Sequence, residues 1–516
     1  MISDNRSIQQ LAALLLAHGV RDVVVCPGSR NAAIAHTLSQ LREFRCHAVT
    51  DERSAGFQAM GLALASGQPT AVCVTSGSAL LNLHPAVAEA YYQHVPLVVI
   101  SADRPQAWIG QQDGQTLPQP GAFGSLVKRS IQVPEIHTQE EDWYANRLIN
   151  EALLEATHHV GGPVHINIPI SEPFYEFHTE QLPKVRVIRR LHLPDFQLQA
   201  GEFHRKKCLV VVGQYPSPMQ LPQGVAILSE HLGNQHQGIR GNLDALVAAI
   251  PETQATDYCP EVLITIGGHI VSKRLKQFLR NHPAQRHIHV SPTGEVTDTF
   301  QCLTDVAECT GEMFFLAAKL QGTQQTEYAQ RWERLADNVR KKEQGERLSK
   351  EADAVRLLLS RLPKNAVLHL ANSSAVRLAE KFPIREEVSV QCNRGVNGIE
   401  GCLSAAVGYA MGAPEKESFV VIGDLSFFYD QNALWNVELP KNLHILLLNN
   451  GGGKIFETLP VPDDPGSRDL ICGRHQMASA EPVCRQFGLR YLSGIQQMAE
   501  FTASGSSVLL EINPKA

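Results

Sequence analysis

Basic residues, aromatic residues and long apolar runs are all scarce in this chain of 516 residues. Lys and Arg number 46 against 52 Asp and Glu, which gives a net charge of −6. A chain without a basic surplus is not typical of proteins that bind nucleic acid or anionic membranes, so we expect neither partner. Apolar stretches such as 96–100 are far shorter than a membrane span needs, and the polar N-terminus predicts no secretory signal.

Cysteine pairs with metal-binding or redox spacing are also missing. The 11 cysteines are odd in number and contain no CxxC, and the 21 histidines contain no HExxH. This pattern favours free thiols in a reducing cytoplasm over disulfides or a zinc site. We therefore expect a cytoplasmic protein without a transition-metal centre.

What remains is a globular composition, with 43% hydrophobic and 19% charged residues, long enough for several domains. In the first third of the chain, short apolar runs alternate with segments of helical periodicity. The expected strands are 22–26, 45–49, 70–75 and 97–102, and the expected helices are 7–18, 32–42, 51–66 and 80–92. Continuous apolar strands that alternate with helices predict a parallel sheet covered on both faces.

Two further α/β units follow a linker-like stretch at 182–195. The second unit has expected strands at 208–212, 225–228, 262–266 and 288–290, and the charged stretch 328–351 is interpreted as a solvated helix leading into the third unit. The third unit resembles the first, because Thr75 and Gly423 occupy equivalent turns 348 positions apart (423 − 75). The preceding expected helices, 52–65 and 400–411, begin with the same offset (400 − 52). We predict an internal duplication and domains at 1–182, 183–345 and 352–516.

The segment 419–456 is the most informative. It predicts a strand ending at Gly423-Asp424, a helix, a second strand at 445–448 and then Asn449-Asn450 with three glycines. Two such turns at the carboxyl edge of a parallel sheet lie close together. Asp424, the Asn450 amide and a following glycine carbonyl are oxygen donors suited to Mg²⁺, and the helix start offers N–H groups to phosphates.

This pattern resembles the diphosphate-binding motif of thiamine-diphosphate enzymes. The resemblance covers essentially the whole chain and implies three doubly wound parallel-sheet α/β domains, of which the first (pyrimidine-binding) and third (diphosphate-binding) are alike. It also implies thiamine diphosphate as cofactor, with Mg²⁺, or Mn²⁺ as an alternative ion, held by Asp424, Asn450 and the Gly452 carbonyl.

One branch is more similar than the others: the 2-succinyl-5-enolpyruvyl-6-hydroxy-3-cyclohexene-1-carboxylate synthase (MenD) family of menaquinone biosynthesis. The similar segments are CPGSRN at 26–31, DERSAGF at 51–57, TSGSALLNLHPA at 75–86, SADRP at 101–105, SKRL at 272–275, NSSAVR at 372–377, NRGVNGIEG at 393–401 and GDLSFFYDQNAL at 423–434. The resemblance implies a transferase that decarboxylates 2-oxoglutarate and adds the succinyl carbanion to isochorismate.

Thiamine-diphosphate chemistry needs a carboxylate beside the aminopyrimidine ring. Glu52 stands at the expected start of a helix in the first domain, and Asp51 serves as its cap, which leaves Glu52 for catalysis. The alternative for Glu52 is a carboxylate stabilised by the helix dipole. The resemblance assigns cofactor contacts to Glu52, Thr75, Gly77, Asn393, Gly398, Ile399, Gly423, Asp424, Leu425, Ser426, Asn450 and Ile455. Ile399 matches the aliphatic residue that wedges beneath the cofactor.

Both implied substrates carry two carboxylates, which the planar fork of arginine binds well. The predicted substrate-binding residues are Ser29, Arg30, Arg104, Gln115, Lys273, Arg274, Ser373, Arg377, Arg394, Ile455, Phe456 and Leu459. The alternative for each cation is a surface salt bridge, and for the last three residues a hydrophobic helix face. The segment after Pro460 is polar and is expected to be irregular, and Asn31 is given no role.

Because the acid and the diphosphate site lie in different domains, the resemblance implies a homodimer or homotetramer with active sites at the subunit interface. The nearest alternative is another thiamine-diphosphate-dependent 2-oxoacid decarboxylase or carboligase. An acetolactate-type synthase would carry FAD in its middle domain, where no GxGxxG occurs. A binding protein without catalysis is the alternative from another class.

Overall fold

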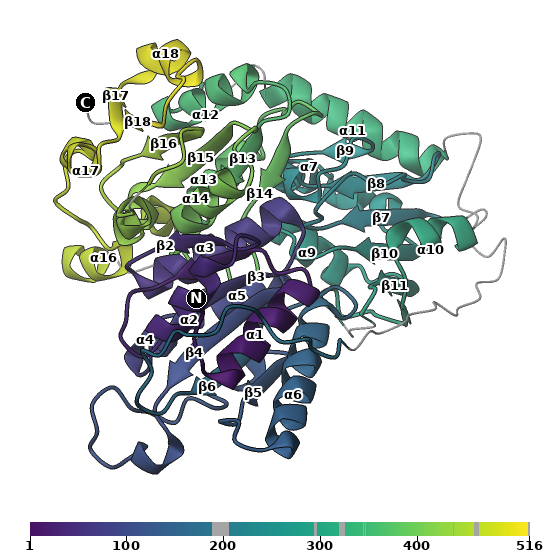
Figure 1. The fold of residues 1–516 in the computed structure, drawn as a ribbon. Helices are drawn as coiled ribbons and strands as arrows, with labels where there is room; N and C mark the ends of the chain where they lie inside the picture. The colour runs from purple at the N-terminus through teal and green to yellow at the C-terminus, as the bar shows by residue number, and fades with distance from the viewer. Residues whose placement is uncertain are drawn as a thin grey trace. The chain divides into compact units, whose positions relative to one another are not determined.

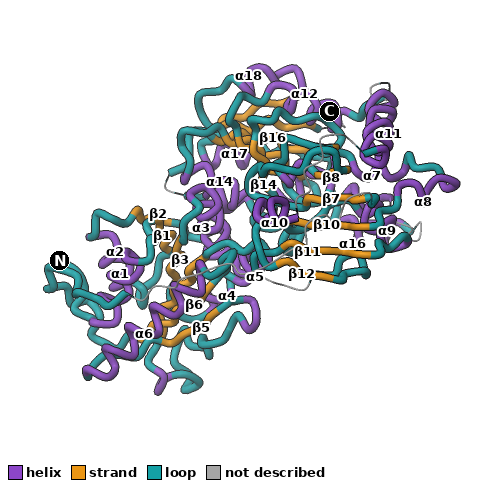
Figure 2. The backbone as a smooth tube through the Cα atoms, turned by 90° about the vertical axis from the view of Figure 1, so that its right-hand side faces the viewer, coloured by secondary structure: helices purple, strands orange, loops and turns teal. Residues whose placement is uncertain are grey.

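The computed structural model describes residues 1–187, 206–293, 297–318, 326–343, 345, 347–436, 438–458 and 464–513. Within these residues the strands form three six-stranded parallel sheets, each accompanied by helices (Figure 1). Figure 2 shows the same alternation of strands and helices along the backbone. The predicted α/β class with three parallel sheets is therefore confirmed. Of the expected linker, 182–187 has no regular structure and 188–195 lies outside the described residues.

The first sheet has the strand order β2-β1-β3-β4-β6-β5. Its strands are β1 (Asp22–Val25), β2 (Arg45–Ala48), β3 (Thr70–Val74), β4 (Leu97–Asp103), β5 (Arg129–Gln132) and β6 (Val164–Pro169). Its helices are α1 (Arg6–Ala17), α2 (Ala32–Gln40), α3 (Glu52–Ser66), α4 (Ser78–Leu81), α5 (His84–Tyr92) and α6 (Gln139–Thr157). The expected single helix at 80–92 is wrong, because Pro85 lies in the first turn of a new helix, α5.

Both faces of this sheet are buried. Val23 and Val98 belong to the core under α1, α2 and α6, whereas the next residues along the two strands, Val24 and Val99, belong to the core under α3 and α5. Since successive side chains on a strand point to opposite faces, helices must cover the sheet on both sides. This confirms the doubly wound arrangement predicted for the first domain.

The middle sheet has the order β12-β11-β10-β7-β8-β9. Its strands are β7 (Cys208–Val212), β8 (Ala226–Ser229), β9 (Ile239–Arg240), β10 (Val262–Ile266), β11 (Arg286–Val290) and β12 (Asp305–Ala307). Its helices are α7 (Leu243–Ala248), α8 (Ala255–Tyr258), α9 (Lys273–Asn281), α10 (Gly311–Ala318) and α11 (Glu327–Glu343). Leu209 and Val210 again join different cores, so this sheet is doubly wound as well.

The stretch 328–351, expected to connect to the third unit with a solvated helix face, does expose such a face, but it also has a buried face that was not expected. The stretch belongs to two helices, α11 and α12 (Lys350–Arg361), and the Ser349 side chain caps the second by accepting from the Ala352 N–H at 3.2 Å. On α11, Trp332 and Tyr328 are buried in the core of the middle domain. The high charge of the stretch reflects one exposed face of an amphipathic helix.

The third sheet has the order β14-β13-β15-β16-β18-β17. Its strands are β13 (Val367–Leu370), β14 (Ser389–Gln391), β15 (Ser418–Gly423), β16 (Leu443–Leu448), β17 (Arg490–Ser493) and β18 (Val508–Ile512). Its helices include α13 (Ser374–Ala379), α14 (Cys402–Gly412), α15 (Asp424–Tyr429), α16 (Pro465–Cys472), α17 (Glu481–Phe487) and α18 (Met498–Thr502). Counted from their first strands, the first and third sheets share one strand order, which confirms that these two sheets are alike, while the order of the middle sheet differs.

By their internal contacts the residues fall into two compact units. One comprises Met1–Leu191, Asn393–Ser493 and Ala503–Glu511, and the other His192–Cys392, Gly494–Thr502 and Ile512–Ala516. The predicted site residues therefore fall into two sets, one in each unit. The predicted domain boundaries stay a prediction.

Two glycines allow the equivalent helices α3 and α14 to pack backbone to backbone. A Cβ at Gly61 would lie 2.1 Å from the Ala405 carbonyl oxygen, and one at Gly408 would lie 2.1 Å from the Gln58 carbonyl oxygen. Any larger residue would push the helices apart. Since Glu52 begins α3, this close packing also fixes the position of the predicted catalytic residue relative to α14.

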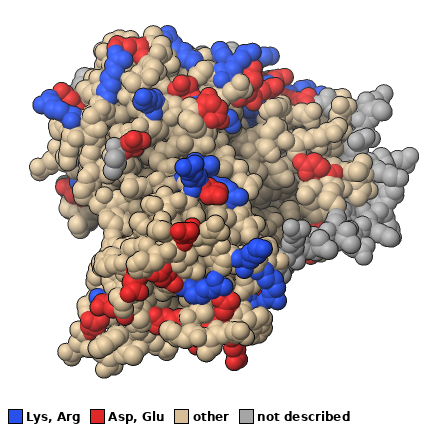
Figure 3. All heavy atoms as spheres, in the orientation of Figure 1, with Lys and Arg blue, Asp and Glu red and all other residues tan. Residues whose placement is uncertain are grey.

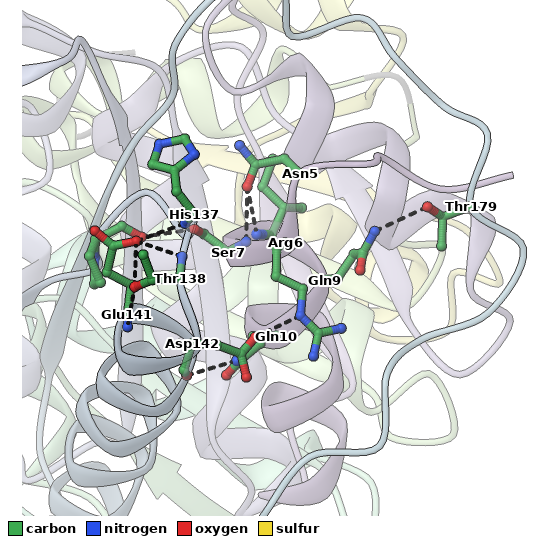
Figure 4. A network of polar contacts seen from close by, with 12 residues as sticks. Asn5, Arg6, Ser7, Gln9, Gln10, His137, Thr138, Glu141, Asp142 and Thr179 are labelled. Atoms are coloured by element: carbon green, nitrogen blue, oxygen red, sulfur yellow. Dashed lines mark hydrogen bonds and ion pairs between the residues drawn. The ribbon is translucent and has the colours of Figure 1, made fainter.

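The starts of α1 and α6 are joined by polar contacts (Figure 4). Asn5 caps α1 by accepting from the N–H groups of Ser7 and Ile8, and Arg6 donates to Asp142 at 2.7 Å. At the start of α6, Thr138 and Glu141 form a capping box. These caps satisfy N–H groups that have no partner within the helices.

Charged side chains of both signs are interspersed on the face drawn in Figure 3. No helix among the described residues is long and apolar enough to cross a membrane. All eleven cysteines are free thiols, most of them buried.

Candidate active site

Asp424 accepts hydrogen bonds from the glycine loop that follows β16. Asp424 is 2% exposed, and its Oδ2 atom accepts from the Gly451 N–H at 2.6 Å and from the Gly452 N–H at 3.0 Å. Because Gly423 at the end of β15 pairs with Leu448 at the end of β16, both turns leave the same sheet edge. The sequence prediction that these turns meet is therefore confirmed.

The loop geometry depends on glycine, and both Gly451 and Gly452 have a positive φ. Gly452 has φ +150°, and a Cβ there would lie 3.2 Å from the Arg474 Cα atom. The three predicted metal donors are a carboxylate (Asp424), an amide (Asn450) and a backbone carbonyl (Gly452), and such hard oxygen donors fit Mg²⁺. In this structure the Gly452 carbonyl accepts from the Lys454 N–H at 2.9 Å.

His475 is a neighbour of Asp424 that sequence reasoning missed. Its Nε2 atom lies 3.1 Å from Asp424 Oδ2. The histidine follows α16, so the expectation of an irregular segment after Pro460 is wrong for 465–472. Asp464 caps α16 by accepting from the Ser467 N–H at 2.8 Å, and Gly473 ends it in the left-handed conformation. An Asp-Pro start and a glycine stop were readable in the sequence.

Glu52 is the first residue of α3, and its neighbours are held firmly. Asp51 caps the helix by accepting from the Arg53 N–H at 3.0 Å, as predicted, and it also accepts from the Asn432 side chain at 2.8 Å. Arg53 donates to the Tyr429 carbonyl oxygen at 2.8 Å and lies over the Tyr429 ring. Residues 429–432 thus hold both neighbours of Glu52.

The Glu52 carboxylate itself has no hydrogen-bond or ion-pair partner among the described residues. Burial raises the pKa of the Cys26 thiol, and the negative charge of Glu52 raises it further. The Glu52 carboxylate therefore lies near Cys26. A half-buried, unpaired carboxylate at a fixed helix start is available to a ligand. This arrangement suits the predicted role of Glu52.

The turn that follows β3 is tightly packed and carries unsatisfied hydroxyls. A Cβ at Gly28 would lie 2.3 Å from Thr75 Cβ, so the 26–31 turn lies directly against Thr75. Thr75 Oγ1 and Ser76 Oγ are buried without a hydrogen-bond partner among the described residues. Because buried hydroxyls are nearly always satisfied, these two fit a site that binds a polar ligand such as the cofactor.

A buried glutamate from the first domain anchors the 393–401 loop. Glu89 on α5 accepts from the Gly395 N–H at 2.7 Å and from the Val396 N–H at 2.9 Å. Burial raises the pKa of Glu89. Within the loop, Asn393 donates to the Gly401 carbonyl oxygen at 3.2 Å. Sequence reasoning missed Glu89, whose partners in this loop lie more than 300 positions away.

The remaining predicted cofactor contacts in this unit lie near that loop and the Asp424 turn. Ser426 on α15 donates to the Ile399 carbonyl oxygen, which ties the 393–401 loop to the turn after β15. Leu425 donates its N–H to Asp424 Oδ1 at 2.7 Å. A Cβ at Gly398 would lie 2.3 Å from the Glu400 carboxylate. Arg394 is buried, with 8% of its surface exposed.

Arg30 is held by protein groups rather than left open. It is 4% exposed, donates to the Ile170 carbonyl oxygen at 2.9 Å, lies 3.3 Å from Glu172 and stacks over Phe174. Ser29, beside it, is exposed. Asn31, to which no role was given, donates to the Cys26 carbonyl oxygen at 2.8 Å and so braces the turn.

Arg104 and Gln115 lie together at the carboxyl end of β4. The Arg104 guanidinium donates to the Gly114 carbonyl oxygen at 3.3 Å and lies 3.6 Å from Asp113. A Cβ at Gly77 would lie 3.1 Å from Gln115 Cα, so this loop passes directly over the Gly77 turn. The structure therefore brings three predicted site residues together.

In the other unit, Asp244 joins two predicted groups of cations. It accepts from Ser272 Oγ at 2.5 Å and the Arg274 N–H at 3.0 Å at the start of α9, and it lies 3.5 Å from Arg377 on α13. Lys273 and Arg274 are exposed. Asp244 lies in no motif that the sequence reasoning quoted.

Ser373, in the same unit, has φ +72° between β13 and α13. A positive φ in a residue other than glycine is strained, and such strain often marks functional turns.

Ile455 and Phe456 lie on the short 3₁₀ helix Lys454–Thr458, where Phe456 donates its N–H to the Gly453 carbonyl oxygen at 2.9 Å. Phe456 is 38% exposed, which leaves its ring available to a ligand. Leu459, predicted with them, lies outside the described residues.

The fold and the site together define a thiamine-diphosphate enzyme. The features that do so are two alike doubly wound domains, the Asp424–glycine turn at a sheet edge and the unpaired Glu52 at a helix start. Residues 6–122 match the family model "Thiamine pyrophosphate enzyme, N-terminal TPP binding domain". The chain belongs to the 2-succinyl-5-enolpyruvyl-6-hydroxy-3-cyclohexene-1-carboxylate synthase family.

Relatives of that name are similar over nearly their whole length. The protein from Phocaeicola vulgatus is 52% identical, covering 97% of this chain and 92% of the relative. The protein from Bacteroides thetaiotaomicron is 51% identical, covering 97% and 93%. That from Desulfotalea psychrophila is 36% identical, covering 94% and 92%.

Proposed function

We propose that this chain catalyses the decarboxylation of 2-oxoglutarate and the addition of the resulting succinyl unit to isochorismate, which would give the compound that the relatives' name specifies. The observation that carries the proposal is the unpaired Glu52 carboxylate at the capped start of α3. Bound thiamine diphosphate supplies the electron sink for the decarboxylation. Glu52 holds the proton that activates the pyrimidine ring.

The remaining roles follow from the residue types. Asp424, Asn450 and the Gly452 carbonyl would hold Mg²⁺, or Mn²⁺ in its place, against the diphosphate. Arg104 and Arg394 in one unit, and Arg274 and Arg377 in the other, are the cations proposed to bind the carboxylates of the two substrates.

The assembly and the compartment are also proposals. We propose a homodimer or homotetramer with active sites at the subunit interface, because the resemblance assigns the acid and the metal site to two different predicted domains, which in such enzymes meet across subunits. The cytoplasm is the proposed compartment, since eleven free thiols suit a reducing environment.

The test incubates the protein with thiamine diphosphate, Mg²⁺ and 2-oxoglutarate, and follows the consumption of added isochorismate. Pyruvate in place of 2-oxoglutarate tests the alternative of another 2-oxoacid decarboxylase. Consumption of pyruvate with isochorismate untouched would overturn the assignment while retaining the cofactor class.

Glu52→Gln is the matching variant, and it should abolish turnover while the circular dichroism spectrum stays unchanged. Its control is Glu140→Gln, an exposed carboxylate in the first turn of α6, which interacts with a helix dipole and should leave turnover unchanged. Equal activity of the two variants would remove Glu52 from the mechanism.

A further inference from the structure

A chain of buried hydrogen bonds runs beneath the loop that carries Gln115. Its centre is Asn167 on β6, which is 0% exposed. Asn167 Oδ1 accepts from Ser101 Oγ at 2.6 Å and from the Gln119 side-chain amide at 2.7 Å, and its own amide donates to Asp103 Oδ2 at 2.8 Å. Asn167 thus uses both its acceptor and its donor in the core.

Two backbone N–H groups lie at the ends of this chain. The Gly77 N–H donates to Gln119 Oε1 at 2.8 Å, and the Arg104 N–H donates to Asp103 Oδ1 at 2.7 Å. Both belong to residues with a predicted role in binding cofactor or substrate. The buried chain therefore links the turn after β3 to the end of β4.

The directions of these hydrogen bonds agree with one another. Burial lowers the pKa of His165 to about 3, so its ring is neutral at physiological pH. Since Ser101 gives its proton to Asn167, the Ser101 oxygen accepts from His165 Nε2, 2.7 Å away. Ser130 then donates to His165 Nδ1 at 3.2 Å. Such a satisfied buried network has one arrangement and is rigid.

The 105–121 loop begins next to Arg104 and is fixed by this network. Gln119, 0% exposed, is its anchor, and its amide also donates to the Ala102 carbonyl oxygen at 3.1 Å. Between these ends the Arg104 guanidinium holds the Gly114 carbonyl oxygen, and the backbone at Gln115 lies against Gly77. The exposed Gln115 side chain is therefore presented from a braced loop.

We propose that Gln119 and Asn167 are positioning residues, which fix the 105–121 loop so that Arg104 and Gln115 meet a carboxylate substrate in one geometry. The location supports this, because ligands bind at the carboxyl ends of the strands in such sheets. Leucine at Gln119 would remove the acceptor of the Gly77 N–H, and leucine at Asn167 would remove the partner of both the Gln119 amide and Asp103. The substrate contact rests on the proposed function.

The test compares Asn167→Leu with Asn150→Leu in the same domain. Asn150 on α6 is also 0% exposed and donates to the Asn146 and Arg186 carbonyl oxygens, and neither of these residues is a predicted site residue. We expect the KM for at least one of the two substrates to rise about tenfold more in Asn167→Leu than in the control, with a smaller change in kcat. Gln119→Leu, which changes the loop itself, should reproduce the effect.

Hydrogen exchange of the 105–121 peptides supplies a readout that needs no activity. Exchange should be faster in both network variants than in wild type and unchanged in Asn150→Leu. KM values of the network variants within twofold of the control would overturn the positioning role. If the wild type consumes neither substrate, the proposed function fails, and exchange alone decides: unchanged exchange in 105–121 would overturn the proposal.

Discussion

Asp430 provides a prediction whose size follows from the structure. The residue lies between α15 and the short helix Gln431–Leu434 and is 0% exposed. Its carboxylate accepts from the Ser404 N–H and from Ser404 Oγ, both at 2.7 Å, in the first turn of α14. Burial raises the pKa of Asp430 to about 6, against which Ser404 and the charge of Arg53 act in the opposite direction.

The direction in which stability changes with pH follows from proton binding to Asp430. Between about pH 4 and pH 6 the folded state holds a proton on Asp430 that the unfolded state has released, so stability from this group falls as the pH rises through that range. The rise of the pKa from 3.8 to about 6, at about 1.36 kcal/mol for each pKa unit, corresponds to about 3 kcal/mol. Above about pH 6 the contribution is constant.

Asp430→Asn keeps the shape of the protonated acid and removes its titration. We expect the variant to match wild type at about pH 4 and to exceed its free energy of unfolding by about 3 kcal/mol at about pH 7.5. Urea-unfolding midpoints at four pH values measure the difference.

The control is Asp464→Asn, at the exposed cap of α16. The backbone hydrogen bond from Ser467 lowers the Asp464 pKa, so its difference from wild type should be flat over the same pH range. An Asp430→Asn difference that is flat as well, or a variant less stable than wild type at about pH 7.5, would refute the reasoning.

Three further predictions concern the contacts around the site. Asn432→Ala removes the side-chain hydrogen bond to Asp51 and should lower kcat with a loss of about 1 kcal/mol in stability, measured by steady-state kinetics and urea unfolding. Glu89→Gln replaces one of the two accepting oxygens with an NH₂ group, which would face the N–H of Gly395 or Val396. This variant should lose about 1–3 kcal/mol in stability and bind thiamine diphosphate more weakly, as measured by calorimetry. Gly61→Ala should lower the melting temperature by several degrees, whereas Gly505→Ala, with open space around it, should not.

The sequence predicted those features that local patterns encode. Strand β15, its Gly423-Asp424 turn and strand β16 were predicted because apolar runs and turn residues are contiguous. The assignment of Asp51 as cap also depended only on neighbouring residues, and the structure confirms it. The duplication was predicted because both copies keep the same spacing between a helix start and the following turn.

Burial and hydrogen bonds that depend on residues far apart in the sequence could not be predicted in the same way. The stretch 328–351 is rich in charge, and the burial of Trp332 depends on a core that distant strands complete. Glu89 lies 306 positions from Gly395, and Asp51 lies 381 positions from Asn432. No periodicity or motif relates residues so far apart, so these site contacts emerged only from the folded chain. The break before α5, in contrast, has a local signal, because Pro85 lies in the first turn of that helix.

Two buried acids whose pKa values are raised by burial, Asp430 and Glu89, lie beside the predicted site. Asp430 lies in the core although we expect an asparagine of the same shape to be more stable at neutral pH. Its charge interacts with that of Arg53, the neighbour of Glu52. Natural proteins retain such groups where geometry matters more than stability. Because Arg53 in turn holds Tyr429, the ionised carboxylate helps to fix the start of α3. The Asp430→Asn substitution is therefore expected to raise the free energy of unfolding and to lower kcat. A gain in stability with a loss of activity would indicate that the carboxylate is retained for function.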